Sequence, residues 1–415
     1  MAAAWDPNAC LHCFAIAAYF LNRRQTRAQQ IGAANRRTTR SNLSAATAIA
    51  MPLTAVVAAA RPPKFVKDGG FRRDLDARVD AYFEQTQLQR RDLPAMYWKS
   101  AVIFAWFGGT WALMVFAGFP WYINVLLAVA HGLAVSTIGM SVMHDANHGG
   151  YSRHPWVNRF FGHSLDVLGC SSYVWKMKHN TIHHTWTNVV GFDDDLEVGA
   201  LARMAPQQPR YPWHRAQHIY VWGLYALLLP KWYLIDDWYN LANARVGRTH
   251  MPAPPPGEMA ALVTGKVIFA AWSLVIPIMF HPVLPVLALW MIASCTLGVV
   301  LATTFQLAHC VENVEFSAFD EPLKRDWAEH QLATTVDFAM ANPVVTWLTG
   351  GLNFQVVHHL YPKVCHLHYP AIARLVAQTA AEHNLKYREQ PTLSGAVAAH
   401  YRWMRGLGQA PAAAV

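Results

Sequence analysis

The amino-acid sequence predicts an all-α integral membrane protein, with four transmembrane helices paired as two hairpins and a helical cap domain outside the bilayer. Only 14% of the 415 residues are charged and 53% are hydrophobic, whereas soluble domains carry about 25% charged residues. Two blocks lack Asp, Glu, Lys and Arg: 44 residues from Ser100 to Met143 and 45 residues from Val267 to Val311. Because a bilayer core takes about 20 helical residues, each block has the length of two spans.

Turn-forming residues divide each block near its middle. Gly118 and Pro120 interrupt the first block, and His281-Pro282 with Pro285 interrupts the second. In lipid the backbone must satisfy its own hydrogen bonds, which favours helices over strands. We therefore expect spans at residues 99–118, 121–142, 264–281 and 284–305.

The segments outside the spans determine the orientation. The apolar stretch 219–230, IYVWGLYALLLP, has only 12 residues, so we expect it to lie at the membrane interface or beneath the spans. The short connections within the hairpins carry no Lys or Arg, whereas the opposite side carries basic residues. By the positive-inside rule, these residues direct the large segments toward the cytosol or an equivalent compartment: Arg90, Arg91, Lys99, Lys176, Lys178 and Lys266.

Residues 1–60 differ from the rest in composition. They contain six arginines, one acidic residue (Asp6) and a cluster of Ser and Thr between residues 38 and 47, which is typical of an organellar transit peptide. A disordered basic arm, or a true start at Met51, is the alternative. We expect residues 61–400 to form one folded domain and residues 401–415 to form a C-terminal tail.

The net charge of +9 is explained by the N-terminal segment and by the basic residues beside the membrane. Nothing in the sequence resembles a nucleic-acid-binding module, so we expect lipid and protein partners and no nucleic acid. Cys10 and Cys13 have CxxC spacing, but a second such pair is missing from the sequence, which makes a metal site there a weak hypothesis.

The histidines gather beside the ends of the second and fourth spans. Residues three or four apart share one face of a helix, so each cluster can direct two or three imidazoles at one point. Three clusters and one further histidine have such positions: His144 and His148; His179, His183 and His184; His358 and His359, preceded by Gln355; and His309.

Topology allows these eight histidines to meet. Two membrane crossings separate the first two clusters from the others, and an even number of crossings leaves all of them on the same side. Imidazole binds iron, zinc, copper and nickel, and eight imidazoles are too many for one ion but suit two. Nearby polar side chains are candidates for orienting the rings, with helix caps or a solvated acidic loop as the alternative: Asp145, Asn188, Asp194 and Glu312.

These residues resemble the three histidine boxes of the membrane-bound fatty acid desaturases. His144 to His148 matches the HxxxH box, His179 to His184 the HxxxHH box, and Gln355 to His359 the QxxHH box. The resemblance extends from about Lys64 to His400, and His309 matches the family's additional histidine. It implies two iron ions, O2 as co-substrate and desaturation of long-chain acyl groups. Gln355 in the third box resembles the front-end branch and implies a ligand that binds through a water.

The same resemblance suggests partners. Front-end enzymes commonly carry a fused haem domain marked by His-Pro-Gly-Gly, and this motif does not occur in the sequence, whose His-Pro pairs are His154-Pro155 and His281-Pro282. A separate electron donor is therefore expected. With a plastid presequence the donor would be ferredoxin and the site a plastid membrane; a free cytochrome and the endoplasmic reticulum are the alternatives. The substrate would be a fatty acyl lipid or an acyl thioester.

Other functions are weighed against this one. Sphingolipid desaturases and related diiron acyl hydroxylases share the pattern. A histidine-rich metal transporter would carry its histidines within the spans, whereas here seven of the eight lie outside the charge-free blocks. His131, in the middle of a span, is most simply a packed or hydrogen-bonded residue, although polar residues inside a membrane merit a test. His366 and His368 are left outside the metal set.

Overall fold

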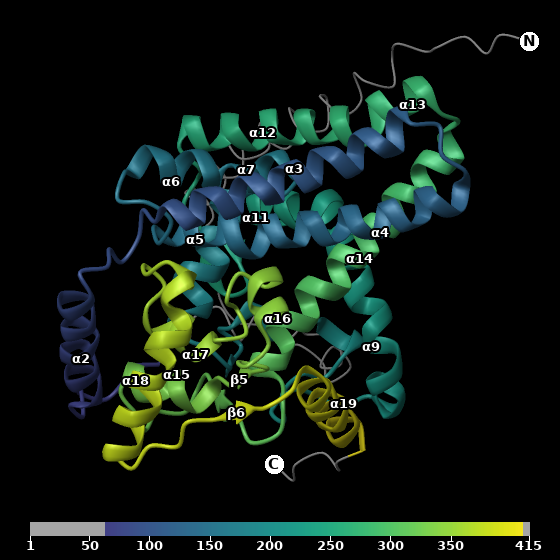
Figure 1. Cartoon of the computed structure of the whole chain (residues 1–415). Helices are drawn as coiled ribbons and strands as arrows, with labels where there is room; N and C mark the ends of the chain where they lie inside the picture. Colours follow the sequence, from purple (N-terminus) through teal and green to yellow (C-terminus); the bar gives the residue numbers. More distant parts are fainter. Residues whose placement is uncertain (1–62, 410–415) are drawn as a thin grey trace, which may run out of the picture. The chain divides into compact units, whose positions relative to one another are not determined.

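The computed structural model describes residues 63–409, and helices dominate this part of the chain (Figure 1). The expected presequence at residues 1–60 and the last residues of the expected tail lie outside the described residues. Four helices are long and apolar enough to cross a membrane, which agrees with the predicted number: Pro94–Phe116, Trp121–His148, Pro256–Phe280 and Val283–His309.

The spans begin earlier than the charge-free blocks suggested. The first is α3 (Pro94–Phe116), and the third starts with α12 (Pro256–Ala270), whereas starts near residues 99 and 264 were expected. Each begins on a proline, which suits the first helical position because its missing N–H would have no partner there. Lys99 and Lys266 therefore lie inside helices. The first charged residue beside an apolar block marks the edge of the membrane and not the end of the helix.

The second and third spans are not uniform α-helices. The second consists of α4 (Trp121–Thr137), the π-helical turn η1 (Ile138–Met143) and α5 (His144–His148). In the third, η7 (Ala271–Val275) follows α12 and leads to α13 (Ile276–Phe280). The fourth span, α14 (Val283–His309), is continuous and runs obliquely from α13 toward the C-terminal helices (Figure 1).

Small residues let the spans approach closely. A Cβ atom on Gly132 of α4 would lie 2.5 Å from the carbonyl oxygen of Ala293 on α14, and one on Gly298 would lie 2.5 Å from the carbonyl oxygen of Tyr225. Glycine at such contacts is typical of packed membrane helices. The two contacts fix α14 against α4 on one side and against α9 (Gln217–Ala226) on the other.

Short helices connect the two hairpins. The apolar stretch 219–230 lies in α9 and α10 and is too short to cross a bilayer, as predicted. Two further π-helical turns, η2 and η6, interrupt this region. The elements are α6 (Pro155–Gly162), α7 (Ser164–Val167), α8 (Ser172–Trp175), η2 (Lys176–His183), η3 (Asp194–Leu196), η4 (Gly199–Leu201), η5 (Pro212–Ala216), α9, α10 (Leu228–Lys231), η6 (Trp232–Asp236) and α11 (Asp237–Asn243).

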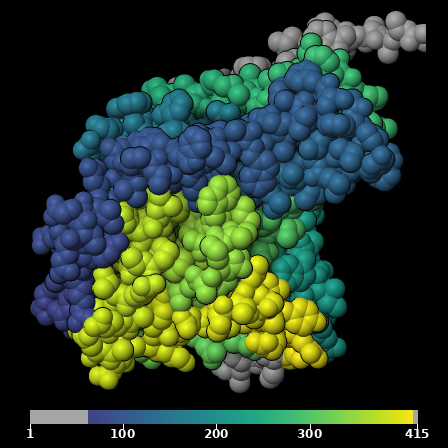
Figure 2. Space-filling model, in the orientation of Figure 1, coloured from purple at the N-terminus to yellow at the C-terminus, as the bar shows by residue number. Residues whose placement is uncertain are grey.

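The C-terminal part forms the cap together with α2 (Phe71–Thr86). Phe71, Leu75, Val79 and Phe83 recur every four residues along α2 and are buried, which is the pattern of a helix with one apolar face. Figure 2 shows α2, in purple, against the yellow C-terminal residues. The other cap elements are α15 (Trp327–Thr334), α16 (Pro343–Leu348), α17 (Gln355–Leu360), η8 (His366–His368), α18 (Tyr369–Glu382) and α19 (Leu393–Gln409).

Strands play a minor part in the described residues, where they form three two-stranded pairs. β1 (Val189–Val190) pairs in parallel with β4 (Ser317–Ala318), β2 (Arg245–Val246) antiparallel with β3 (Thr249–His250), and β5 (Asp337–Phe338) in parallel with β6 (Glu389–Gln390). The first and third pairs join segments far apart in sequence and hold the loops around the histidines.

The last helix belongs to the packed cap. α19 continues through residue 400, so the expected boundary between domain and tail falls inside a helix. His400 is fully buried; its Nδ1 lies 2.6 Å from the carbonyl oxygen of Cys310, and its Nε2 lies 2.8 Å from the Tyr225 hydroxyl. These contacts attach α19 to α9 and to the end of α14.

Candidate metal centre

A π-helical turn brings two histidines of the second box together. In η2 the backbone N–H of His184 donates to the carbonyl of His179, five residues earlier, at 3.1 Å. Residues five apart in an α-helix point about 140° away from each other at 100° per residue, whereas a π turn stacks them. The Nε2 atoms of His179 and His184 therefore lie 3.2 Å apart.

The first group of imidazoles comes from three elements. His144, His148, His179 and His358 each offer a ring nitrogen within 4.8 Å of the others, and all four side chains are buried. The first two belong to α5, the third to η2 and the fourth to α17. Nε2 of His144 lies 3.2 Å from Nε2 of His179, so these lone pairs converge on one point.

The second group lies beside the first. His183, His309 and His359 form a buried set with the same spacing limit, and the Nε2 atoms of His309 and His359 are 3.2 Å apart. His184 lies between the two groups, with its ring stacked on His359 at 4.4 Å and edge-on to His148 at 4.7 Å. The structure thus brings together all eight histidines predicted from the sequence, in two adjacent groups.

Hydrogen bonds at Nδ1 leave Nε2 of several rings free to bind a metal. Nδ1 of His183 lies 3.1 Å from both Asp193 carboxylate oxygens. Nδ1 of His309 lies 3.3 Å from the carbonyl oxygen of Thr334, and Nδ1 of His359 lies 2.8 Å from Oε1 of Gln331. Each partner is an acceptor, so Nδ1 carries the proton and Nε2 keeps its lone pair.

Two of the four expected orienting residues contact the site. Asp145 lies with one carboxylate oxygen 4.0 Å from Nδ1 of His144. Asn188 has φ of 57°, a conformation that asparagine tolerates better than most residues. Its side-chain amide donates to the carbonyl of His309 at 2.9 Å and so fixes the end of α14.

The other two expected residues make different contacts. Asp194 pairs with Lys178 at 3.1 Å, and its neighbour Asp193 takes the position beside His183. Asp195, the next residue of η3, lies near both groups, 3.2 Å from Lys178 and 3.5 Å from Nδ1 of His183. Glu312 pairs with Arg402 of α19 at 2.9 Å and its side chain is 40% exposed. The structure therefore replaces Asp194 by Asp193 and removes Glu312 from the surroundings of the histidines.

The sequence analysis missed several residues that hold the rings. Gln331 contacts His359 and also accepts from the Thr187 hydroxyl at 2.8 Å. The Tyr369 hydroxyl lies 3.3 Å from Nδ1 of His358. His366, which was left outside the metal set, has its Nδ1 2.8 Å from Asp145. The proximity of His366 to the third box was a usable signal, whereas nothing in the sequence marks Gln331.

Gln355 lies in the first turn of α17, on the helix that carries His358 and His359. Its side chain is 1% exposed, and neither its amide nitrogen nor its amide oxygen has a hydrogen-bond partner. A buried amide without partners costs free energy. This residue therefore has both polar atoms available for a ligand or a water.

Burial keeps most of these imidazoles neutral. It lowers the pKa of His179, His184, His358 and His359 well below the usual range, and the neighbouring histidines lower it further. His183 differs: burial opposes its charge, but the Asp193 carboxylate raises its pKa above the ordinary value. Neutral imidazoles are the form that coordinates metals.

The donor set fits iron. It consists of neutral imidazole nitrogens, several of which lack any other partner: Nε2 of His148 and Nε2 of His358 are buried and unpartnered. Imidazole suits iron as well as zinc and copper, and carboxylates orient rings in many metal sites. Two adjacent groups of nitrogens can hold two ions, with Gln355 beside the first group's His358 on α17.

Apolar cavities adjoin the histidines. A small cavity of about 40 Å³ is lined by His144 and by apolar side chains such as Met143 and Leu165. It shares four lining residues with a cavity of about 120 Å³ between the spans, namely Val135, Leu168, Tyr233 and Leu297. It shares four others with a cavity of about 470 Å³ that is lined by His179 and by charged residues, namely Trp175, Trp232, Leu301 and Phe305.

These features define a class of protein: a four-span helical membrane protein with a buried histidine cage beside an apolar cavity. The Fatty acid desaturase family model matches residues 120–391. The sn-1 linoleoyl-lipid 6-desaturase of Arthrospira platensis is 38% identical over 350 residues, which cover 84% of this chain and 95% of that protein. The enzyme of the same name from Synechocystis sp. is 36% identical, with 84% and 98% covered.

A third relative is the acyl-lipid (8-3)-desaturase of Physcomitrium patens, which is 33% identical over 336 residues that cover 80% of this chain and 70% of that protein. The family-model match covers the second, third and fourth spans and all eight histidines of the cage. The chain belongs to the fatty acid desaturase family and is a fatty acid desaturase, as the histidine boxes predicted.

Proposed function

We propose that the chain is a diiron front-end desaturase, which inserts a double bond between an existing one and the carboxyl end of a lipid-bound acyl chain. The observation that carries this proposal is the apolar cavity lined by His144, because it brings an acyl chain to the histidine cage. Two of the relatives named above are linoleoyl-lipid desaturases, which supports a glycerolipid carrier and a substrate already unsaturated. The acyl thioester stays the alternative.

We propose that one iron binds His144, His148, His179 and His358 and that the other binds His183, His309 and His359, with His184 between them. Gln355 would contribute through a water. When bound, the two irons supply the reduction of O2 that removes the hydrogens. The reaction takes two hydrogens from adjacent methylenes, with O2, two electrons and two protons, and gives the alkene and two waters.

The chain's own residues position the substrate and the ligands. The apolar walls of the adjoining cavities would hold the methylenes, at about 0.8 kcal/mol for each buried CH2, so the carbons beside His144 would be those that react. Trp175 lines the two cavities nearest the histidines and packs on His179, with ring centroids 4.5 Å apart. It would therefore hold the chain at the cage. The charged wall of the largest cavity would face the polar end of the lipid.

The electron donor and the membrane remain part of the proposal. Because the sequence lacks a His-Pro-Gly-Gly haem motif, we propose a separate donor. The composition of residues 1–60 supports a plastid membrane and ferredoxin, with the endoplasmic reticulum and a free cytochrome as the alternative pair. Reconstitution with each purified donor would separate them, since only the native donor should support turnover at low concentration.

The test is expression in a host with both donors and analysis of total fatty acids by gas chromatography. We expect a new unsaturated acid and about two irons per chain. His183→Ala should lose iron and product together. Hydroxylated products in place of an alkene would favour the acyl hydroxylase, and desaturated sphingoid bases would favour the sphingolipid enzyme. A loaded protein with no product from any lipid would contradict the proposal.

A further inference from the structure

A chain of four polar side chains runs from the first span to the metal centre. Nζ of Lys99 in α3 lies 2.9 Å from Nε2 of His366, and Nδ1 of His366 lies 2.8 Å from a carboxylate oxygen of Asp145. The other carboxylate oxygen of Asp145 lies 4.0 Å from Nδ1 of His144. All four side chains are buried. A lysine and an aspartate are rarely buried in this way, so their place beside the histidine cage indicates a role there.

The hydrogen bonds in this chain have one consistent direction. The ammonium of Lys99 has donors only, so it donates to Nε2 of His366. The neutral ring then carries its single proton on Nδ1 and donates to Asp145, which also accepts from the backbone N–H of His366 at 3.2 Å. At 4.0 Å the charge of this carboxylate favours a proton on Nδ1 of His144. Nε2 of His144 is thereby left with its lone pair for a metal.

The segment of residues 365–369, which includes η8, also holds a second candidate ligand. The hydroxyl of Tyr369 lies 3.3 Å from Nδ1 of His358, and Tyr369 is fully buried. The segment packs closely against the preceding loop, where a Cβ on Gly351 would lie 3.0 Å from Cβ of His366 and 3.1 Å from Cδ2 of Tyr369. His144 and His358 belong to the same group of imidazoles. One short segment therefore supports two members of the first group.

The second group of imidazoles has its supports elsewhere. The partners of its Nδ1 atoms include Asp193, Gln331 and the carbonyl of Thr334. Gln331 and Thr334 belong to α15, and Asp193 precedes η3. Within the described residues, none of the hydrogen bonds to the rings of the second group comes from residues 365–369. The two groups are therefore held by different parts of the fold.

We propose that His366 and Tyr369 are positioning residues for the metal ion of the first group alone. His366 acts on His144 through Asp145, and Tyr369 acts directly on His358. Lys99 fixes the ring of His366 and so connects the first span to one of the two ions. The inference rests on the proposed function for its metal, and it goes beyond that function because it assigns the two ions to independent supports.

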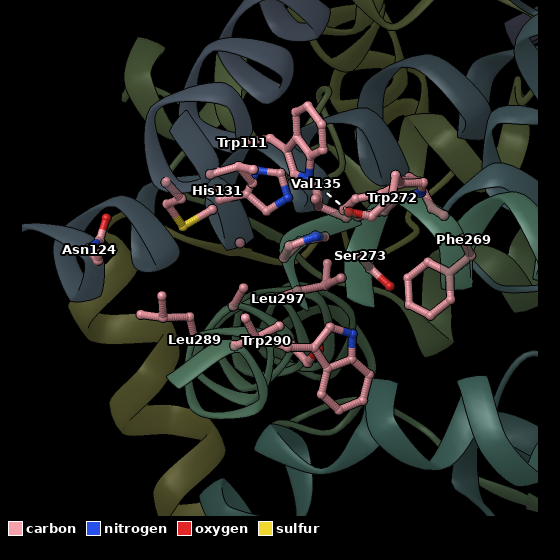
Figure 3. A pocket seen from close by; sticks show the side chains of 18 of the residues that line it. Trp111, Asn124, His131, Val135, Phe269, Trp272, Ser273, Leu289, Trp290 and Leu297 are labelled. Carbon is pink, nitrogen blue, oxygen red and sulfur yellow. Dashed lines mark hydrogen bonds between the residues drawn. The ribbon is translucent and has the colours of Figure 1, made fainter. Parts of the chain in front are cut away.

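These positioning residues lie outside the cavities proposed for the acyl chain. Figure 3 shows the cavity between the spans, where side chains such as Trp111 and Trp272 come from the membrane helices. Lys99, His366 and Tyr369 line neither this cavity nor the two beside the histidines. Substitutions at these three positions should therefore change metal retention without replacing a wall that contacts the substrate.

The test follows the loss of Fe²⁺ from the purified full-length protein as the concentration of a chelator is raised. The wild type should hold two ions. His366→Gln directs an amide toward Lys99 but removes the donor to Asp145, so one of the two ions should bind about 10–100-fold more weakly. His366→Asn, whose amide nitrogen takes the place of Nδ1, should keep both ions. Equal losses in the two variants, or weakening of both ions in His366→Gln, would overturn the proposal.

A control in the same short helix separates positioning from folding. His368 is buried, and its Nε2 lies 2.8 Å from the carbonyl oxygen of Gln89. His368→Ala should lower the unfolding temperature, because it removes this contact, and should leave both ions bound. Release of one ion from this variant as well would show that damage to η8, and not the lost donor of His366, weakens the site. That result would refute the proposal.

Pairs of variants identify which ion is affected. Tyr369→Phe removes only the hydroxyl and should weaken the same ion as His366→Gln, so the variant with both changes should still hold one ion tightly. His366→Gln combined with Asp193→Asn should hold neither ion tightly, because Asp193 supports the second group. Weakening of both ions in the first pair, or one tight ion in the second pair, would contradict the separate supports.

Lys99→Met tests the connection to the first span. The variant keeps the length of the side chain but removes the charge and the donor to His366. We expect it to weaken the same ion as His366→Gln, by a smaller factor, because Asp145 still accepts from the His366 ring. Two ions held as tightly as in the wild type would remove Lys99 from the chain.

These measurements need no turnover, which separates the inference from the proposed function. A wild type that holds two ions but forms no desaturated product counts against the proposed function alone, since the variants still show which ion each residue supports. A wild type that holds fewer than two ions contradicts both the proposed function and the inference.

Discussion

Several imidazoles of the cage have a hydrogen-bond partner at Nδ1. Asp193 shows this pairing most clearly, because its carboxylate faces Nδ1 of His183 and also accepts from the backbone N–H of Asn188 at 2.9 Å. Its side chain is buried and also accepts from the backbone N–H of Asp195 at 3.1 Å, so hydrogen bonds from the histidine loop stabilise its charge. The arrangement fixes both the tautomer and the direction of the His183 ring.

Asp193→Asn should weaken iron binding. The amide keeps an acceptor for Asn188, but it can present an N–H to His183 Nδ1, which then no longer needs to carry the proton. We expect iron affinity to fall by about 10–100-fold, measured as iron retained per chain against increasing chelator. Asp194→Asn is the control, since Asp194 pairs with Lys178. Equal iron retention in the two variants would contradict the assignment of Asp193.

A second residue, Asp337, should make the stability depend on pH. Burial raises the pKa of this carboxyl from 3.8 to about 7, although hydrogen bonds from Tyr387 and from the backbone of Val356 oppose the shift. Glu389 raises it further. Because the folded state holds the proton more tightly than the unfolded state between pH 3.8 and 7, the free energy of unfolding should rise as the pH falls through this window.

One such group changes the free energy of unfolding by at most about 1.4 kcal/mol per pH unit. Thermal unfolding of the detergent-solubilised protein between pH 5 and 8 measures it, and Asp337→Asn should remove this contribution. Other groups contribute equally to wild type and variant, so the quantity to compare is the difference in unfolding free energy between the two. A difference that does not change with pH would show that Asp337 ionises normally.

At the scale of elements, the π-helical winding explains how histidines five residues apart in the second box bring their rings together. The sequence predicted that helices would carry the histidines. An ordinary α-helix is enough to place His144 and His148, which are four residues apart, on one face. The sequence could not predict that η2 would be π-helical, and only this winding brings His184 back over His179. π turns depend on how neighbouring segments pack, which a local pattern does not encode.

The approach of two histidine-bearing elements depends on Gly350. Its φ is +61°, and a Cβ there would lie 2.4 Å from the carbonyl oxygen of Met140 in η1. The loop that contains it leads into α17, so this glycine lets α17 lie against the turn that precedes His144. No alanine fits here without moving one of the two backbones.

Gly350→Ala should therefore lower both the stability and the iron content. The left-handed backbone alone costs on the order of 1–3 kcal/mol, and relief of the clash would move His358 and His359 away from His144. Thermal unfolding and iron per chain measure the two effects. Gly108→Ala in α3 is the control because a Cβ there meets nothing within 4 Å. Iron content equal to that of the control would show that the close contact between Gly350 and Met140 does not position the histidines.

At the scale of the whole molecule, the sequence predicted the number of spans and the meeting of the histidines because both follow from hydropathy and the parity of crossings. It did not predict the partners Gln331 and Tyr369. Gln331 comes from α15, and Tyr369 begins α18. Their contacts depend on how the cap folds over the cage, and long-range packing of this kind leaves no local periodicity. The cavity between the spans was likewise invisible, because its lining residues look like ordinary span residues.

The parity argument also predicts the membrane topology. The connection at Gly118 and the one at Pro282 should lie on the opposite side from the histidine cage, because each joins two spans of a hairpin. Acceptor sequences for N-glycosylation, flanked by flexible spacers, can be inserted after Gly118 or between Asp320 and Glu321 of the exposed cap. Only an acceptor on the lumenal side of the endoplasmic reticulum is glycosylated in a eukaryotic host.

We expect the insertion after Gly118 to be glycosylated and the insertion after Asp320 to remain unmodified, with the shift in electrophoretic mobility as the measurement. The natural sequence Asn42-Leu43-Ser44 is itself an acceptor, so Asn42→Gln is the background for both insertions. Glycosylation of both sites, or of the cap alone, would mean that the number of crossings between them is not odd as predicted or that the orientation is inverted. Glycosylation of both sites would also contradict the even number of crossings between His144 and His309. These two histidines could then not bind the same pair of ions.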